Sequence, residues 1–365
     1  MTVTKEAPMK FGLILVPQVR KGEPEPFGEL VEQIEFAEEL GYESVWLTEH
    51  HFSEYGRAAV SALAGYAAAR TSRIRISTAI VVLPFHHPIQ VAEDWATLDH
   101  LSGGRVDVGI GRGSQPAEFA GFDVSMDEAR ERYQESLNII KKAWTEESFS
   151  YDGQFWKIPE VEVLPKPIQK PHPPLWCAAV SPYTVKMTVD NGINGLIGPY
   201  LAPFEMLKRD YFDVWHQATA DAGRQDLQMC HNEFVYVGES DEEVKRDVEE
   251  YVMWYVRKAA KIWGQRDRSK VSAQYANYSD ILEFFDTVKF EEVYNDLAIL
   301  GTPDTVTEKL RWLRDEGGCD YVMNFMWFGG ISHEKAMRNM ELFAKEVMPR
   351  LEADRAAEPA ATSTT

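Results

Sequence analysis

The chain has 365 residues, of which 44% are hydrophobic, and its 58 acidic and 38 basic residues give a formal net charge of −20. This much apolar material can bury a large core, in one large α/β domain or two smaller ones. A net charge of this size repels phosphate backbones and anionic membrane surfaces, so we expect neither nucleic acid nor a membrane as a partner. The three cysteines are far apart with no CxxC pair, which argues against a disulfide framework and a structural zinc site.

Targeting signals are also missing from the sequence. The first ten residues contain no apolar signal segment. The longest charge-free run, 76–92, holds two prolines and two histidines, which makes it unsuited to cross a membrane. We therefore expect a cytoplasmic protein.

Eight short runs rich in β-branched residues recur along the chain, and a helical pattern follows each of them. The runs are 11–16, 44–48, 74–83, 106–110, 175–180, 193–198, 230–238 and 321–328. Apolar residues at helical spacing predict helices between them, for example in 27–41, where Gly41 marks the helix end. Alternating strands and helices predict a parallel sheet, and eight such units in this length favour a closed (β/α)8 TIM barrel.

The domain organisation follows from this pattern. Residues 1–352 are expected to form one barrel domain, and the low-complexity segment 353–365 a disordered tail. More than eighty residues separate the last two strands, where one helix would suffice. The polar and aromatic part of this interval, about 260–292, predicts a long lid insertion between strands seven and eight, because loops of this length are usually functional.

Histidines are enriched where the second and third strands end, which in such barrels is the catalytic end. Glu49, His50 and His51 follow the second strand, and His86 and His87 follow the third. A histidine that titrates near neutrality suits proton transfer, so His50 and His51 are the catalytic candidates. His51 is expected either to orient the pocket or to pack below it.

The second histidine pair has a simpler interpretation. Before Pro88, His86 and His87 are expected to shape a loop and a helix start. A mononuclear metal hydrolase could use these histidines with Glu49. However, neither an HxH pair nor a carboxylate on a late strand accompanies them, so no metal is expected.

A second group of residues suggests a phosphate site after strands four and five. Ser181 fits a helix N-cap, and Pro182 suits the first helical position, where free N–H groups bind anions. Arg112 leaves the neighbouring strand within "GIGRG" and can pair with phosphate through its planar fork. This glycine run is not a dinucleotide fingerprint, because no GxGxxG motif opens a helix.

These residues lie in segments that resemble the bacterial luciferase-like family of FMN-dependent monooxygenases. The matching segments are "LGYESVWLTEHHF", "RIRISTAIVVLPFHHPIQVAEDWATLDHLSGGRVDVGIGRG", "VSPYT" and "MELFAKEVMPRL". The resemblance extends over residues 9–351.

The resemblance implies a two-component monooxygenase that uses reduced FMN and O2 to oxygenate a small organic substrate through a flavin peroxide. A separate flavin reductase would supply the reduced FMN, in keeping with the missing nicotinamide fingerprint. By position, Arg112, Ser181 and Thr184 would hold the phosphate, and His50 matches the family's catalytic histidine. The remaining flavin contacts would be Glu49, Val180 and Ala79, the last beside a non-proline cis peptide at Ala79–Ile80.

Further expectations concern the mouth of the barrel and the oligomeric state. Phe52, Trp327 and Phe328, together with the lid, would exclude water from the reduced flavin. Gly111 stands where bacterial luciferase has a cysteine, which argues against light emission and would leave room near the reactive flavin edge. The small-residue segment 57–71 would suit close helix pairing in a homodimer, as is common in the family. A deazaflavin-dependent hydride transferase and a non-catalytic flavin-binding subunit remain alternatives.

Overall fold

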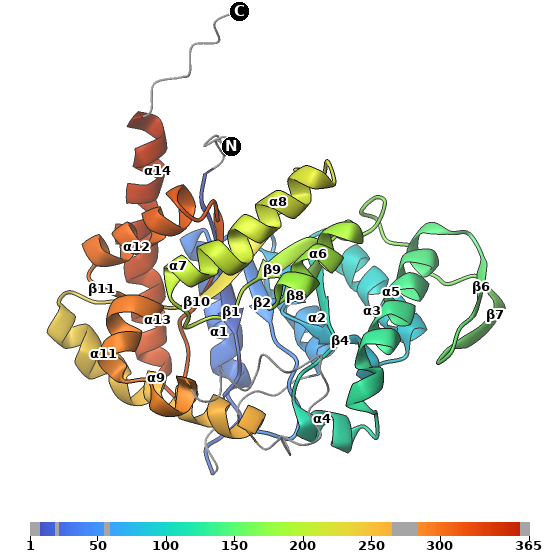
Figure 1. Cartoon of the computed structure of the whole chain (residues 1–365), viewed down its shortest axis with the longest axis horizontal. Helices are drawn as coiled ribbons and strands as arrows, with labels where there is room; N and C mark the ends of the chain where they lie inside the picture. The colour runs from blue at the N-terminus through green and yellow to red at the C-terminus, as the bar shows by residue number, and fades with distance from the viewer. Residues whose placement is uncertain (1–7, 19–21, 55–58, 265–283, 358–365) are drawn as a thin grey trace, which may run out of the picture.

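In the computed structural model, which describes residues 8–18, 22–54, 59–264 and 284–357, eight parallel strands close into a barrel (Figure 1). β10 closes it by pairing with β9 on one side, Met229 opposite Gly195, and with β12 on the other, His231 opposite Val322. The predicted (β/α)8 fold is confirmed. The barrel strands are β1 (Lys10–Leu15), β2 (Ser44–Leu47), β3 (Arg75–Thr78), β5 (Val106–Gly111), β8 (Leu175–Ala179), β9 (Asn194–Ile197), β10 (Met229–Val237) and β12 (Tyr321–Phe325).

The third predicted strand differs from the prediction. The run 74–83 is not one strand: it breaks into β3 and a short β4 (Val81–Val82), and the peptide Ala79–Ile80 between them is cis. β3 begins beside β5, and β4 pairs again with the end of β5, where Val82 lies opposite Gly111.

Three strands outside the barrel were not predicted. β6 (Phe149–Asp152) and β7 (Lys157–Val161) form an antiparallel hairpin that projects to one side (Figure 1). β11 (Ile299–Gly301) extends the sheet by pairing with the last residues of β10.

Helices surround the barrel, and their ends follow local sequence signals. α1 ends at Gly41, which adopts the left-handed conformation with φ 86°, as predicted for a glycine at this position. The longer helices are α1 (Phe27–Leu40), α2 (Val60–Arg70), α3 (Pro88–Ser102), α5 (Ala129–Thr145), α6 (Pro182–Asp190), α8 (Asp213–Asp221), α9 (Asp241–Gly264), α12 (Pro303–Asp315), α13 (His333–Leu342) and α14 (Met348–Ala357). Shorter ones include α4 (Pro116–Gly121), α7 (Phe204–Leu207) and α11 (Phe290–Glu292).

Large aromatic rings fill the barrel interior. Trp46 and Trp176 meet edge to face with ring centroids 5.3 Å apart, and Tyr321 lies within 6.1 Å of Trp46. Gly12 makes room for them, because a Cβ atom there would come within 2.6 Å of Trp46 Nε1. The interior is therefore packed, and ligands are confined to its ends.

Parts of the predicted lid and tail lie outside the described residues. α9 continues to Gly264, so the predicted lid begins within a helix, and residues 265–283 are not described. α14 runs to Ala357 and so includes the first residues of the predicted tail, whereas 358–365 are not described. None of the helices in the described part of the chain has the length and apolar character that a membrane span needs.

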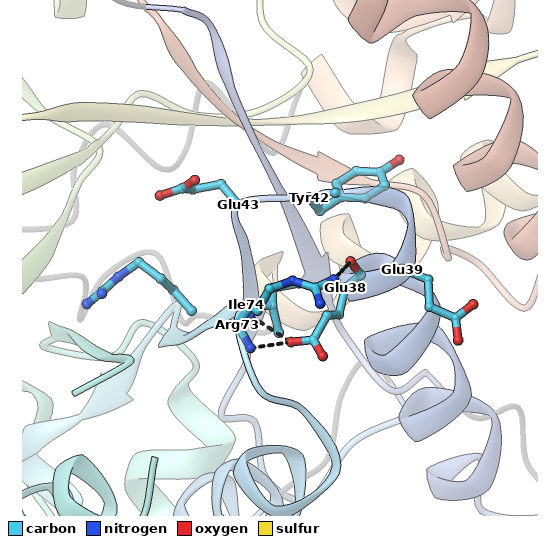
Figure 2. A pocket seen from close by; sticks show the side chains of 8 residues that line it. Glu38, Glu39, Tyr42, Glu43, Arg73 and Ile74 are labelled. Carbon is cyan, nitrogen blue, oxygen red and sulfur yellow. Dashed lines mark hydrogen bonds between the residues drawn. The ribbon is translucent and has the colours of Figure 1, made fainter. Parts of the chain in front are cut away.

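A surface hollow of about 270 Å³ lies at the amino ends of β2 and β3, opposite the carboxyl ends of the strands (Figure 2). In it, Glu38 of α1 accepts hydrogen bonds from the backbone N–H groups of Ser72, Arg73 and Ile74, at 2.9, 2.6 and 2.8 Å. Burial opposes ionisation of Glu38, but these hydrogen bonds outweigh it and lower its pKa to about 2. The hollow is thus organised around a structural contact that holds α1 against the start of β3.

We predict that Glu38→Ala lowers the free energy of unfolding by about 1 kcal/mol at pH 7, allowing for solvent screening of this partly exposed site. Because the folded pKa is lowered, this stabilisation is fully present above pH 4.5 and is lost as the pH falls towards 2. Urea unfolding at pH 7 and pH 3 measures both effects. Glu39→Ala, an exposed neighbour in the same hollow, is the control, and an equal loss in both variants would contradict the prediction.

Candidate active site

The candidate residues meet at the carboxyl ends of neighbouring strands. Leu47 of β2 lies opposite Thr78 of β3, so Glu49 and Ala79 follow adjacent strand ends. Ile110 of β5 lies opposite Cys177 of β8, which brings Arg112 alongside the end of β8. All eight predicted site residues therefore fall on one end of the barrel.

Glu49 is a buried carboxylate on which three segments converge. Its side chain is 1% exposed. Oε1 accepts hydrogen bonds from His51 Nε2 at 2.9 Å and His86 Nε2 at 2.7 Å, and Oε2 accepts one from the Val82 amide at 2.9 Å. Burial opposes ionisation, but these hydrogen bonds and the charge of His86 lower the Glu49 pKa to about 2. Glu49 is therefore ionised at neutral pH.

His86 was expected to shape a loop, and it lies in the loop before α3 with its ring bound to Glu49, a partner that was not predicted. Burial lowers the pKa of His86, but the hydrogen bond to Glu49 and its charge outweigh this effect and raise the pKa. The prediction holds for His87, which caps α3 by accepting a hydrogen bond from the Ile89 amide.

His50 belongs to a different network from His51, although both follow the end of β2. His50 Nδ1 lies 3.2 Å from Glu118 Oε1 and 2.9 Å from Gln115 Nε2. A protonated Nδ1 can donate to Glu118, and a deprotonated Nδ1 can accept from the Gln115 amide. The site thus offers this nitrogen a partner in both protonation states.

Glu118 and Gln115 were missed in the sequence. Both are buried, and they lie on or beside the short helix α4, at the lower edge of Figure 1. Glu118 also accepts a hydrogen bond from the His51 amide at 2.9 Å. The available signal was the acid in "QPAEF", two residues after a proline in the loop that follows a predicted strand.

Aromatic rings border the His51 side of the site. His51 meets Phe122 edge to face at 4.7 Å, and Phe122 stacks on Phe85 at the same centroid distance. Of the three aromatic residues predicted at the mouth, Phe52 is 66% exposed, whereas Trp327 and Phe328 are buried at 6% and 0%. Trp327 and Phe328 therefore belong to the core, so they cannot form an exposed rim in this conformation.

The predicted helix start after β8 is confirmed. Ser181 Oγ caps α6 by accepting a hydrogen bond from the Thr184 amide at 3.2 Å, and the two hydroxyls are 2.8 Å apart. Burial raises the pKa of Cys177 on β8, and the charge of nearby Arg112 works against this rise. Val180, just before the cap, is half-buried, and its carbonyl accepts a hydrogen bond from Tyr211 at 3.4 Å. Arg112 and the α6 N-terminus thus occupy neighbouring strand ends.

Two glycines of β5 let the Thr78–Ile80 segment approach the strand. A Cβ atom on Gly109 would lie 1.8 Å from the Thr78 carbonyl oxygen, and one on Gly111 would lie 1.9 Å from Ile80 Cδ1. The room expected at Gly111 is therefore occupied by the Ile80 side chain, which corrects that prediction.

The described ranges contain no group of three or more His, Cys, Asp or Glu side chains arranged to hold a metal ion. The clustered acids and imidazoles at Glu49 and Glu118 bind one another through hydrogen bonds instead.

Comparisons with known proteins agree on one family. The family model for luciferase-like monooxygenases matches residues 9–320. The oxygenase component of the flavin-dependent trigonelline monooxygenase of Acinetobacter baylyi is 28% identical over 88% of this chain and 89% of its own. The crystal structure of monooxygenase RslO1 from Streptomyces bottropensis has a TM-score of 0.80 at 28% identity, covering 94% of this chain and 99% of its own.

A further solved structure supports the fold alone. The oxygenating constituent of 3,6-diketocamphane monooxygenase from Pseudomonas putida, a type II Baeyer–Villiger monooxygenase in complex with FMN, has a TM-score of 0.79 at 23% identity. The comparison covers 94% of this chain and 98% of that one.

We predict that Gly109→Ala costs about 3 kcal/mol of stability and Gly111→Ala about 1 kcal/mol, because overpacking costs more where the neighbour cannot move. The new methyl group would meet backbone at Gly109, but the far end of a flexible side chain at Gly111. Urea unfolding of the two variants provides a matched comparison. Equal costs would show that the Thr78–Ile80 segment moves as easily as the Ile80 side chain.

Proposed function

The chain belongs to the luciferase-like monooxygenase family, and we propose that it is the oxygenase component of a two-component system that uses reduced FMN and O2 to oxygenate a small organic substrate. The observation that carries this proposal is the arrangement of His50 with Gln115 and Glu118 on the same barrel end as Arg112 and the capped start of α6. A proton-exchanging group and an anion-binding helix start are the two protein functions that such a reaction needs.

Arg112, Ser181 and Thr184 would hold the flavin phosphate. The two hydroxyls and the backbone N–H of Tyr183 in the first turn of α6 supply donors, and Arg112 supplies charge. The positive end of the helix dipole adds to the attraction for a dianion. When bound, reduced FMN supplies the electrons that activate O2.

Ala79, Val180 and Glu49 would position the flavin ring. Ala79 and Val180 are half-buried, follow the ends of β3 and β8 on either side of β5, and offer small apolar contacts. Glu49 already accepts three hydrogen bonds, so its contribution is to fix the Val82 amide and the His51 ring. Glu49 would therefore act on the flavin site through Val82 and His51, without a direct polar contact to the flavin.

His50 would carry the proton transfer. With Nδ1 directed at Glu118 and Gln115, Nε2 on the other side of the ring is the nitrogen that exchanges a proton with the reacting groups. His51 would act through pocket shape, because its ring is held by Glu49 and packs on Phe122.

Two partners complete the proposal. A separate flavin reductase would supply reduced FMN, as for an oxygenase component. A second copy of the chain would pack on α2, whose alanines include exposed positions and whose Tyr66 is 54% exposed.

The function is tested by oxygen consumption with NADH as the electron source. The pure protein with NADH and FMN should consume no O2 above background, and adding an FMN reductase should start oxygenation of accepted test ketones, aldehydes or aromatic compounds. Turnover with reduced deazaflavin but not with reduced FMN would instead establish the hydride transferase alternative. Flavin binding without turnover of any tested substrate would favour the non-catalytic subunit.

For the phosphate site, we predict that the native protein binds reduced FMN much more tightly than reduced riboflavin. Arg112→Ala should remove most of this difference, about 2 kcal/mol for a charge-assisted hydrogen bond. Anaerobic titration of both flavins measures the preference. Equal affinities in the native protein would contradict the assignment.

For the proton-transfer site, His50→Ala should lower turnover by about 10²-fold, the usual effect of removing a general acid or base, with FMN affinity nearly unchanged. Glu118→Gln should keep a hydrogen-bond acceptor for Nδ1 and should therefore lower turnover less than His50→Ala does. Steady-state kinetics of the two variants measure both effects. Full activity in His50→Ala would rule out this role.

A further inference from the structure

We propose that His86 is a positioning residue of the flavin site, which acts by pairing with Glu49 and so holding the Ala79–Val82 segment and the His51 ring in place. The link between His86 and Glu49 is read from the structure alone, whereas its consequence for flavin binding rests on the function proposed above.

The geometry makes Glu49 the junction of three segments. His86 comes from the loop before α3, Val82 from β4, and His51 from the loop after β2. Their donor atoms lie 2.7, 2.9 and 2.9 Å from the two Glu49 oxygens. The carboxylate therefore fixes the main chain at Val82, three residues after Ala79, which is the predicted flavin contact.

This junction needs a positive charge. A carboxylate that is 1% exposed is strongly destabilised unless it is paired. The Val82 amide is neutral. The backbone amide of His51 donates to Glu118, so His51 contacts Glu49 through its ring alone. His86 is 35% exposed and can take up a proton from solvent while donating to Glu49.

The charges around His86 favour its protonated form. Glu49 faces it from the loop after β2, and Asp94 on α3 adds a second negative charge. Glu118 on α4 binds the His51 amide and is not among the groups that shift the His86 pKa. The charged groups that shift the His86 pKa are both carboxylates, Glu49 and Asp94.

The adjacent histidine provides a matched control. His87 caps α3 and packs edge to face on Trp156 at 4.6 Å, with no hydrogen bond to Glu49 among the described contacts. His87→Asn keeps a good N-cap residue and should leave the Glu49 junction intact. His86→Phe keeps a ring but removes the donor, and His86→Gln keeps a neutral donor.

The experiment begins with the flavin-free protein. Hydrogen–deuterium exchange of peptides spanning residues 79–85 reports the Val82 amide directly. His86→Phe should lose roughly tenfold in protection there, the change expected from one charge-assisted hydrogen bond, and His87→Asn should match the native protein. The protection in His86→Gln should lie between the values of these two variants. If His86→Phe does not fold, His86→Gln takes its place in the test.

Stability and flavin binding give the second and third readouts. Because the His86 pKa is raised on folding, its contribution is fully present below pH 6.5 and is lost as the pH rises through the folded value. The urea midpoint of the native protein should therefore exceed that of His86→Phe by more at pH 6 than at pH 9. Reduced FMN should bind roughly tenfold more weakly to His86→Phe and normally to His87→Asn.

Two results would overturn the proposal in different places. Native-like protection at 79–85 in His86→Phe would show that His86 does not hold this segment. Lost protection with unchanged FMN affinity would keep the structural link but refute positioning of the flavin site. If the native protein itself binds no reduced FMN, the proposed function fails, and the flavin half of this inference fails with it.

Discussion

The ionised carboxylate of Glu49 is the constraint around which the barrel mouth is built. A buried charge must be surrounded by donors, and here those donors come from segments that follow two different strands. The requirement therefore fixes the relative positions of loops that the barrel strands alone would leave free. It also explains why a histidine outside the expected catalytic doublet, His86, is bound to Glu49.

A steric constraint on β5 complements this electrostatic one. β5 has glycine at positions 109 and 111. The Thr78–Ile80 segment occupies the space that a larger residue's side chain would fill at these positions. Glycine at both positions gives the break between β3 and β4 its room, with the tighter contact at Gly109, where the neighbour is backbone. Glu49 then holds the far side of the same segment at Val82. The segment between β3 and β4 is thus fixed from both sides, which makes it a suitable support for a planar ligand.

The sequence predicted those features whose causes are local. The alternation of barrel strands and helices, the glycine end of α1 and the serine cap of α6 are encoded within a few residues, and these were confirmed, apart from the break in the third strand. The partner of His86 was not predicted, because Glu49 is 37 positions away and the contact depends on how two loops meet. The burial of Trp327 and Phe328 was missed for a similar reason, since a residue after a strand can turn either outward or back into the core.

The adjacent histidines raise a question that strand alternation alone could not answer, since both lie beyond the last residue of β2. Their roles differ because of their partners: the His50 ring meets Glu118 and Gln115, and the His51 ring meets Glu49. The two networks are nevertheless joined, because Glu118 also binds the His51 amide. A change in the charge of Glu118 is therefore felt by the main chain between the two rings. If His50 carries the proton transfer proposed above, the hydrogen bond from the His51 amide to Glu118 would hold the main chain between the two rings in place.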